Sequence, residues 1–272
     1  MVRIIIALLF CFPAVAFAQT YQQLSERAIE CIEKDSLPKA EELLLQALKL
    51  EPKNAKNALL FSNLGLVQRR LGEFDKALES YSFALNFAPL AVPILLDRAA
   101  IYMEMGKTDR AYTDYCQVLD EDKQNKEALL MRAYIYVLRR DYPAARMDYN
   151  RLLELDPQSY SGRLGLATLE QKEGKFREAL EILNKMLAAT PEDATLYIAR
   201  ADVEREMQHE DLALVDLEEA IRLDVASADA YLLRGNIYLA QKKKGLAKAD
   251  FEKAISLGVP PADLHEQLRQ CK

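Results

Sequence analysis

Apolar and polar positions recur along this chain with a fixed period over most of its length. One column of alanines sets the register: it recurs every 34 residues from Ala77 onward, and its first member, Ala40, lies 37 residues before Ala77. The column consists of Ala40, Ala77, Ala111, Ala145, Ala179, Ala213 and Ala247. Large apolar residues stand four positions after each of these alanines, and further apolar residues stand seven positions after, so all three share one face of a helix. The pattern predicts seven amphipathic helices, with three extra residues in the first linker, around residues 52–57.

A second column, of small residues, stands twelve positions before each alanine. It consists of Ala28, Gly65, Ala99, Ala133, Ala167, Ala201 and Gly235. A turn marked by Gly72, Gly106 and Gly174 in three of the repeats separates the two columns, so the small residues lie on a preceding helix. Small residues let two antiparallel helices approach closely, and a single hairpin needs stacked neighbours to bury its apolar face. With 50% apolar residues, 9 Gly and 10 Pro, the chain is predicted to be all-α.

The repeat resembles the tetratricopeptide repeat in its length, its small-residue columns, its aromatic column and its closing proline. That proline appears as Pro52, Pro89, Pro157 and Pro191, and is replaced by Lys123, Val225 and Val259 in three repeats. The resemblance implies a solenoid of seven helical hairpins over residues 19–261, wound as a right-handed superhelix, with the first helix of each hairpin lining a concave groove. Residues 262–272 lack the small-residue column and are predicted to form a capping helix that covers the last repeat with Leu264 and Leu268.

The first eighteen residues differ from the rest and are predicted to be a secretory signal peptide. Arg3 is followed by an unbroken apolar run over residues 4–12, and Ala16 and Ala18 put small residues where signal peptidase reads, so cleavage is expected before Gln19. A lipid-attachment role for Cys11 is disfavoured, because Phe10 precedes it where lipoprotein signals need a small residue. No later apolar run has spanning length, so we expect an exported bacterial protein, periplasmic or secreted, without stable membrane insertion.

Charge and composition argue against nucleic-acid binding and catalysis. The net charge is -6, so phosphate backbones are not attracted in general. The two histidines, His209 and His265, lie apart from any recognised metal-ligand spacing. There is no glycine-rich phosphate loop and no nucleophile elbow. We therefore expect no enzyme activity, no metal and no cofactor.

An arginine and an aspartate at two fixed positions of the repeat are present together or absent together in six of the seven repeats. Four repeats carry both: Arg98 with Asp114, Arg132 with Asp148, Arg200 with Asp216, and Arg234 with Asp250. Two repeats carry neither, with Leu64 and Ser80, and Leu166 and Ile182, in those places, and the first has Arg27 but Leu43. The pattern predicts a pair that bridges the two helices of a hairpin. The alternative is an arginine ladder that binds carboxylates of a ligand.

Three cysteines remain after the predicted cleavage: Cys31, Cys116 and Cys271. They fall in the first repeat, the third repeat and the tail. A repeat in a solenoid touches only its neighbours, and a disulfide needs Cα atoms within roughly 7 Å. The spacing predicts three free thiols without an internal disulfide, and Cys271, near the chain end, is the thiol expected to allow adventitious dimers.

The inner helix predicted over residues 126–140 is apolar almost all round. Leu129, Ala133 and Tyr136 are accounted for by packing within the stack, whereas other apolar residues of this helix have no such role. We predict that these residues and their equivalents in the repeats on either side form an apolar, protein-binding strip at the middle of the groove: Leu96, Ala100, Met103, Leu130, Tyr134, Val137, Leu138 and Leu164. The alternative is that superhelical curvature buries them.

These observations favour a non-catalytic scaffold that binds a peptide or helix of a partner protein, in the cell envelope. A periplasmic chaperone-like or assembly-factor subunit is an alternative, and an enzyme or carbohydrate-handling subunit is a weaker one. A receptor for terminal carboxylates is disfavoured, because no lysine stands at the positions where related proteins place it. Those positions hold Ser25, Ser62, Leu96, Leu130, Leu164, Ile198 and Leu232.

Overall fold

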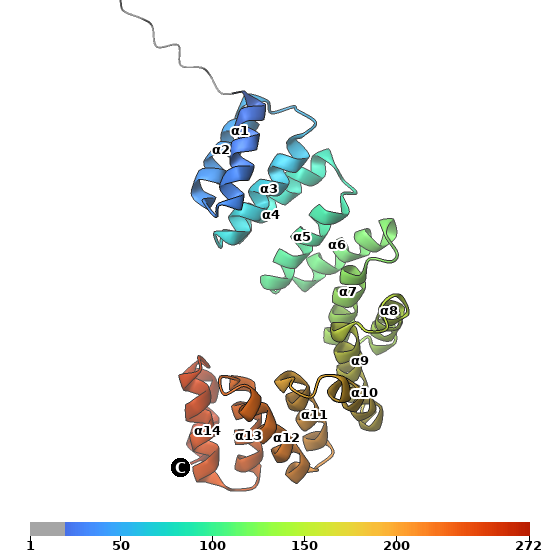
Figure 1. The fold of residues 1–272 in the computed structure, drawn as a ribbon, viewed down its shortest axis with the longest axis vertical. Helices are drawn as coiled ribbons and strands as arrows, with labels where there is room; N and C mark the ends of the chain where they lie inside the picture. The colour runs from blue at the N-terminus through green and yellow to red at the C-terminus, as the bar shows by residue number, and fades with distance from the viewer. Residues whose placement is uncertain (1–19) are drawn as a thin grey trace, which may run out of the picture. The chain divides into compact units, whose positions relative to one another are not determined.

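A computed structural model describes residues 20–272 of the chain (Figure 1). Within these residues, fifteen α-helices and one short 3-10 helix follow one another as stacked helical hairpins, which confirms the all-α solenoid fold predicted from the sequence. The predicted signal peptide, residues 1–18, lies outside the described residues. None of the helices between residues 20 and 272 has both the length and the apolar character needed to cross a membrane.

The chain divides into two compact units, residues 1–121 and 122–272, and the described part of the first begins at residue 20. The first unit contains α1 (Tyr21–Glu33), α2 (Leu37–Leu50), α3 (Asn57–Arg70), α4 (Phe74–Phe87), α5 (Val92–Glu104) and α6 (Thr108–Glu121). The second contains α7 (Lys126–Leu138), α8 (Tyr142–Leu155), α9 (Tyr160–Lys172), α10 (Phe176–Ala189), α11 (Ala194–Glu206), α12 (Glu210–Leu223), α13 (Ala228–Ala240), α14 (Lys244–Ser256), the 3-10 helix η1 (Pro261–Leu264) and α15 (His265–Gln270). Each odd-numbered helix from α1 to α13 pairs with the helix that follows it.

Small residues sit where the two helices of a hairpin cross. Every alanine of the register column is completely buried. The opposing small column is equally tight: a Cβ atom added to Gly65 would lie 2.9 Å from ring atoms of Tyr81, and one added to Gly235 would lie 2.8 Å from Phe251. The aromatic rings fill the space that the missing side chains leave, so the column of small residues and the aromatic column form one packing unit.

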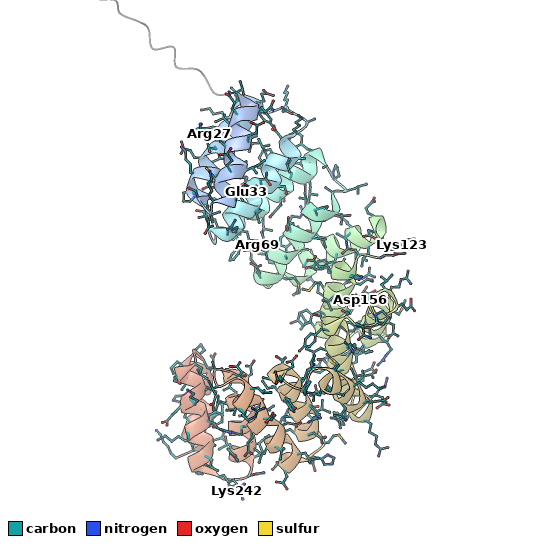
Figure 2. All side chains as sticks on the ribbon, in the orientation of Figure 1. Arg27, Glu33, Arg69, Lys123, Asp156 and Lys242 are labelled. Carbon is teal, nitrogen blue, oxygen red and sulfur yellow. The ribbon has the colours of Figure 1, made fainter. Side chains whose placement is uncertain are left out.

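The turn inside each hairpin contains one residue with a left-handed backbone, five positions before the register alanine. Gly72, Gly106 and Gly174 have φ of 69–79° there. The other four hairpins place non-glycine residues in the same conformation, namely Asp35, Arg140, Gln208 and Lys242, with φ of 57–65°. Lys242 can be seen at the turn between α13 and α14 in Figure 2. Glycine adopts this conformation without steric cost, so the three glycines found by sequence mark a turn that all seven hairpins share.

The C-terminal segment begins differently from the single capping helix predicted for residues 262–272. Its first turn is the 3-10 helix η1, and only residues 265–270 are α-helical. Leu264 and Cys271 are buried and Leu268 is half-buried against Phe251 and neighbouring residues of the last hairpin. The burial of Cys271 argues against the adventitious dimers expected at this thiol, because the segment folds back and packs that side chain into the core.

Candidate functional site

Each of the four predicted arginine–aspartate pairs is joined by two parallel hydrogen bonds. Arg98 Nε donates to Asp114 Oδ2 at 2.8 Å and Nη2 donates to Oδ1 at 2.7 Å. The same two-bond geometry joins Arg132 to Asp148, Arg200 to Asp216 and Arg234 to Asp250, at 2.7–2.9 Å. All four aspartates are buried, with 2–6% of each residue exposed. Planar bidentate contacts of this kind fix the second helix of a hairpin against the first.

The arginines of these pairs make further contacts inside the stack. Arg98 Nη1 donates to Ser82 Oγ at 3.2 Å, and Arg200 Nη1 donates to Asn184 Oδ1 at 2.8 Å, so each reaches the preceding hairpin. The hydrogen bonds to Asp216 raise the pKa of the Arg200 guanidinium. Each of the four guanidiniums also lies over a tyrosine ring, at 5.5–5.9 Å from the ring centre. These arginines are thereby committed to internal partners, which favours the structural interpretation over a ligand-binding ladder. By contrast Arg27, whose hairpin has Leu43 in the aspartate position, is exposed on α1 (Figure 2).

The two hairpins that carry neither residue of the pair have other polar bridges, which the sequence analysis missed. In the second hairpin, Ser80 Oγ donates to the buried Gln68 Oε1 at 2.7 Å, and Gln68 Nε2 donates to Glu41 at 3.0 Å. In the fifth, Arg146 of α8 donates to both carboxylate oxygens of the buried Glu170, at 2.5 and 2.8 Å, and to Glu173 at 2.7 Å. Gln68 and Glu170 occupy one register position, nine residues before the register alanine, where three other repeats have tyrosine. That column was the signal that could have revealed these bridges.

The predicted apolar strip divides between the two compact units. Leu96, Ala100 and Met103 belong to the first unit, where all three are half-buried on α5. The other five residues belong to the second unit. Leu130 and Val137 of α7 are half-buried against the core around Ala133 and Leu169. The strip as a whole stays a prediction.

Tyr134 and Leu138 are the exposed large apolar residues of α7, with 45% and 53% of each residue exposed. Tyr134 lies near the hydroxyl of Tyr149, whose pKa rises to about 12, chiefly through burial and also through Tyr134. The Tyr149 ring in turn presses on Gly165 of α9, where an added Cβ would lie 2.5 Å from Cε1. Tyr134 is thus accessible to a partner and lies close to the tightly packed Tyr149.

A groove of about 490 Å³ runs across the inner helices α9, α11 and α13 of the second unit. Its apolar floor contains Leu164 from the predicted strip, together with Ile198, Leu232 and Leu233. Three of these occupy the positions where a terminal-carboxylate receptor has lysine. From the sequence, Ile198 and Leu232 stood out only as positions without the receptor's lysine, and their place in a groove was not predicted.

Polar side chains line the same groove. They include Lys172, Asp202, Asp229 and Asn236. Asp202 is held in place by Gln171 Nε2, which donates to Oδ2 at 2.8 Å, and by Arg205 Nη2, which donates to Oδ1 at 2.7 Å. An apolar floor with a few fixed polar groups is a common form of binding site.

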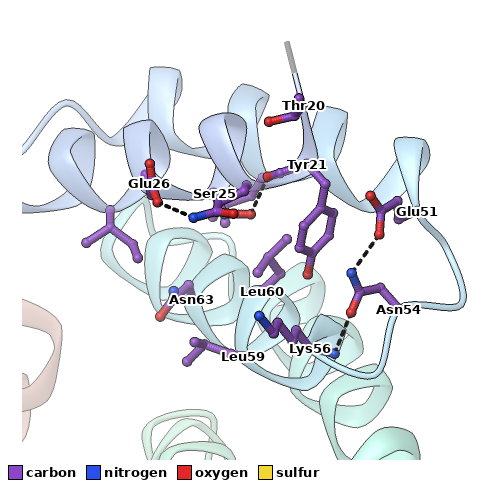
Figure 3. A pocket seen from close by; sticks show the side chains of 13 residues that line it. Thr20, Tyr21, Ser25, Glu26, Glu51, Asn54, Lys56, Leu59, Leu60 and Asn63 are labelled. Carbon is purple, nitrogen blue, oxygen red and sulfur yellow. Dashed lines mark hydrogen bonds between the residues drawn. The ribbon is translucent and has the colours of Figure 1, made fainter.

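A second cavity, of about 530 Å³, lies in the first unit between α1, α3 and the linker that joins α2 to α3 (Figure 3). The sequence predicted the extra residues of this linker, but it did not predict the pocket that the linker lines. Its lining combines apolar residues such as Ile29 and Leu60 with Glu26, Glu51 and Lys56.

Residues 20–272 contain no group of three or more His, Cys, Asp or Glu placed to hold a metal ion. His209 precedes α12 in the turn after α11, with Nδ1 2.7 Å from Glu204 Oε2, and His265 begins α15. The His209–Glu204 contact joins residues five apart on the exposed edge of one hairpin. It has the geometry of a local hydrogen bond in a turn.

Comparisons with known proteins agree with the geometry. Three tetratricopeptide-repeat family models match residues 96–160, 138–203 and 228–257, and no curated protein matches the chain. The solved structure of a tetratricopeptide repeat protein from Parabacteroides merdae is 37% identical, with a TM-score of 0.86 over 93% of this chain and 99% of that one.

Two more distant structures show the fold alone. The C-terminal part of a repeat-containing protein from Cytophaga hutchinsonii is 16% identical, with a TM-score of 0.60 over 91% of this chain and 99% of that one. The pilF protein of Pseudomonas aeruginosa is also 16% identical, with a TM-score of 0.60 over 77% of this chain and 94% of that one. The likeness at 37% identity extends over nearly the whole of both chains. The chain therefore belongs to the tetratricopeptide-repeat family.

Proposed function

We propose that this protein is a non-catalytic scaffold of the cell envelope that binds a peptide or helix of a partner protein along its inner helices. Tetratricopeptide repeats typically mediate protein–protein interactions, and the family is generally non-catalytic. The observation that carries the proposal is the groove across α9, α11 and α13, to which each helix contributes one large apolar residue: Leu164, Ile198 and Leu232. Partner helices and extended peptides use such grooves for their apolar side chains, and use polar groups to set direction.

The proposed location rests on the sequence. The apolar run over residues 4–12 and the small residues before Gln19 have the order of a secretory signal peptide. Fractionation of cells that produce the full chain tests this part, together with N-terminal sequencing of the mature protein. Recovery of the uncleaved chain in the cytoplasm would reject it and would leave the binding proposal untouched.

The binding proposal is tested by blocking the groove without disturbing the core. Thr168 is exposed on α9 and lines the groove, so Thr168→Arg fills the space with a long side chain and buries no charge. Asn150→Arg adds the same charge at an exposed position of α8 outside the groove and is the matched control. Both variants are expected to melt like wild type.

Crosslinking in intact cells, followed by identification of the captured proteins, reads out binding. We expect Thr168→Arg to lose a partner that wild type and Asn150→Arg both capture. Capture of the same proteins by all three would exclude this groove as the binding surface.

A further inference from the structure

The linker between α2 and α3, three residues longer than its counterparts, forms one wall of the pocket in the first unit. The three extra residues lie in this linker, and Glu51, Asn54 and Lys56 from it line the pocket. The buried side chains of Leu44 and Leu60 form the floor, and Ile29 and Leu59, 41% and 58% exposed, stand at the mouth. A volume of about 530 Å³ is large enough for one extended side chain and its neighbours.

Hydrogen bonds hold the linker in place as a wall. The Tyr21 hydroxyl donates to Asn57 Oδ1 at 3.0 Å, and Asn57 Nδ2 donates to the carbonyl oxygen of Glu51 at 2.8 Å. Asn54 Nδ2 donates to Glu51 Oε2 at 2.7 Å, which orients that carboxylate. Because Asn57 is completely buried with both ends of its amide satisfied, the wall is formed before any ligand arrives.

The charges in the pocket are not balanced by the chain. Figure 3 shows Glu26 and Glu51 towards opposite ends, with Tyr21 and Leu60 between them. Each carboxylate accepts a hydrogen bond from a neutral amide, from Gln22 Nε2 at Glu26 and from Asn54 Nδ2 at Glu51. Within the described residues, neither carboxylate forms an ion pair with a basic group, and Lys56 forms none with an acidic group. The lining therefore carries one more negative than positive charge.

We propose that this pocket binds a lysine or arginine side chain, flanked by apolar residues, of the partner protein; the inference rests on the proposed protein-binding function. The apolar floor accommodates the methylene stem of such a side chain, and a carboxylate at either end accepts its charged head. Lys56 repels the positive charge of such a side chain, so it weakens the binding that the two carboxylates favour. The partner is thereby expected to carry a basic residue within an apolar segment, in addition to whatever it places in the groove of the second unit.

Three fluorescent decapeptides of alternating sequence, Leu with Lys, Leu with Glu and Leu with Gln, test the charge preference against the full chain. At low ionic strength the Lys peptide is expected to bind at least tenfold more tightly than the Gln peptide. The double variant Glu26→Gln with Glu51→Gln keeps hydrogen-bond acceptors at both positions and is expected to remove that preference. Lys56→Gln is expected to strengthen binding of the Lys peptide. Glu33→Gln with Glu79→Gln removes two exposed charges of the same unit outside the pocket and serves as the control.

Equal weakening by the pocket variant and the control would overturn the proposal, since any negative surface would then suffice. Tighter binding of the Glu peptide, weakened by Lys56→Gln, would overturn it in favour of an acidic ligand. The outcome is separable from the proposed function, because partner capture that depends on Thr168 reports on the second unit alone. A chain that captures its partner through that groove but shows no preference among the peptides refutes only the pocket.

Discussion

At the scale of single residues, the stability of this fold depends on buried polar pairs and on absent side chains. Asp250 is 5% exposed and receives two hydrogen bonds from Arg234, at 2.8 and 2.9 Å. A buried pair of this kind contributes little net stability compared with apolar residues, whereas loss of one partner leaves an uncompensated charge. The pairs therefore act mainly as constraints that align the two helices of a hairpin.

Asp250→Ala is expected to lower the free energy of unfolding by ~3–5 kcal/mol, because it leaves the Arg234 guanidinium without its carboxylate. Adding Arg234→Leu to Asp250→Ala removes the stranded charge and is expected to recover more than half of the loss. Urea unfolding followed by circular dichroism compares the two variants. Equal midpoints for the single and the double variant would contradict a pair that acts as one unit.

At Gly165, stability depends on the absence of a side chain. A Cβ at this position would lie 2.5 Å from Tyr149 Cε1, so Gly165→Ala forces the ring or helix α9 to move. We expect a loss of ~1–3 kcal/mol from this overpacking. Gly245→Ala is the matched control, because nothing lies within 4 Å of its added Cβ, and it is expected to leave thermal stability unchanged or slightly higher. Similar losses for both would show that the Tyr149 contact is not decisive.

At the scale of helices, the periodic columns predicted most of the architecture. Features at positions without a repeating residue type were not predicted. The alanine and small-residue columns located every hairpin, because burial at a helix crossing leaves no choice of residue size. The turns were recognised only where glycine stands, since Arg140 and Lys242 adopt the same left-handed backbone without a compositional signal. The bridge from Arg146 to Glu170 was not predicted for a related reason: it joins successive hairpins, whereas the paired columns in the sequence lie within one hairpin.

The left-handed position in the turn of each hairpin predicts stability changes of opposite sign at Lys242 and Gly174. Lys242 has φ of 60°, which costs a non-glycine residue on the order of 1 kcal/mol, so Lys242→Gly is expected to raise the free energy of unfolding by roughly that amount or less. Gly174 has φ of 76°, and Gly174→Ala is expected to lower it by ~1 kcal/mol. Thermal melts of both variants provide the measurement. A stabilising Gly174→Ala would show that backbone strain at this turn is negligible.

The cluster that joins α8 to α9 predicts a pH dependence. Hydrogen bonds from Lys175 and Arg146 lower the pKa of Glu173 below its usual value. A carboxylate with a lowered folded-state pKa contributes stability that is present above its unfolded pKa of about 4.3 and is lost as the pH falls through the folded value. Glu173→Gln is therefore expected to reduce stability at pH 7 and to flatten the loss of stability below about pH 4.5. An unchanged acid slope, measured by urea unfolding from pH 7 to pH 3, would exclude this carboxylate as a contributor.

At the scale of the whole molecule, the candidate surfaces were harder to predict than the fold, because the sequence pattern shows periodicity and not accessibility. Leu130 and Val137 fit the predicted strip by register, yet they are half-buried against Ala133 and Leu169. Tyr134 and Leu138 of the same helix are open. Which apolar residues of an inner helix are covered depends on the neighbouring helices, and those contacts are absent from any single repeat's sequence.

The repeat architecture also predicts how far the destabilisation caused by one substitution extends along the chain. Leu44 is completely buried in the core that α1, α2 and α3 share, so Leu44→Ala opens a cavity there and is expected to cost ~2–5 kcal/mol locally. Each repeat in a solenoid contacts only its neighbours, so stability is a sum of repeat and interface terms. Amide hydrogen exchange is therefore expected to accelerate most in α1–α4 and to approach wild-type rates in α12–α14. Met186→Ala, which opens a cavity beside α10 and α11, is the control and is expected to shift the affected region to the second unit. Uniform acceleration across all helices after either change would mean that the chain unfolds as one cooperative body, contrary to nearest-neighbour coupling.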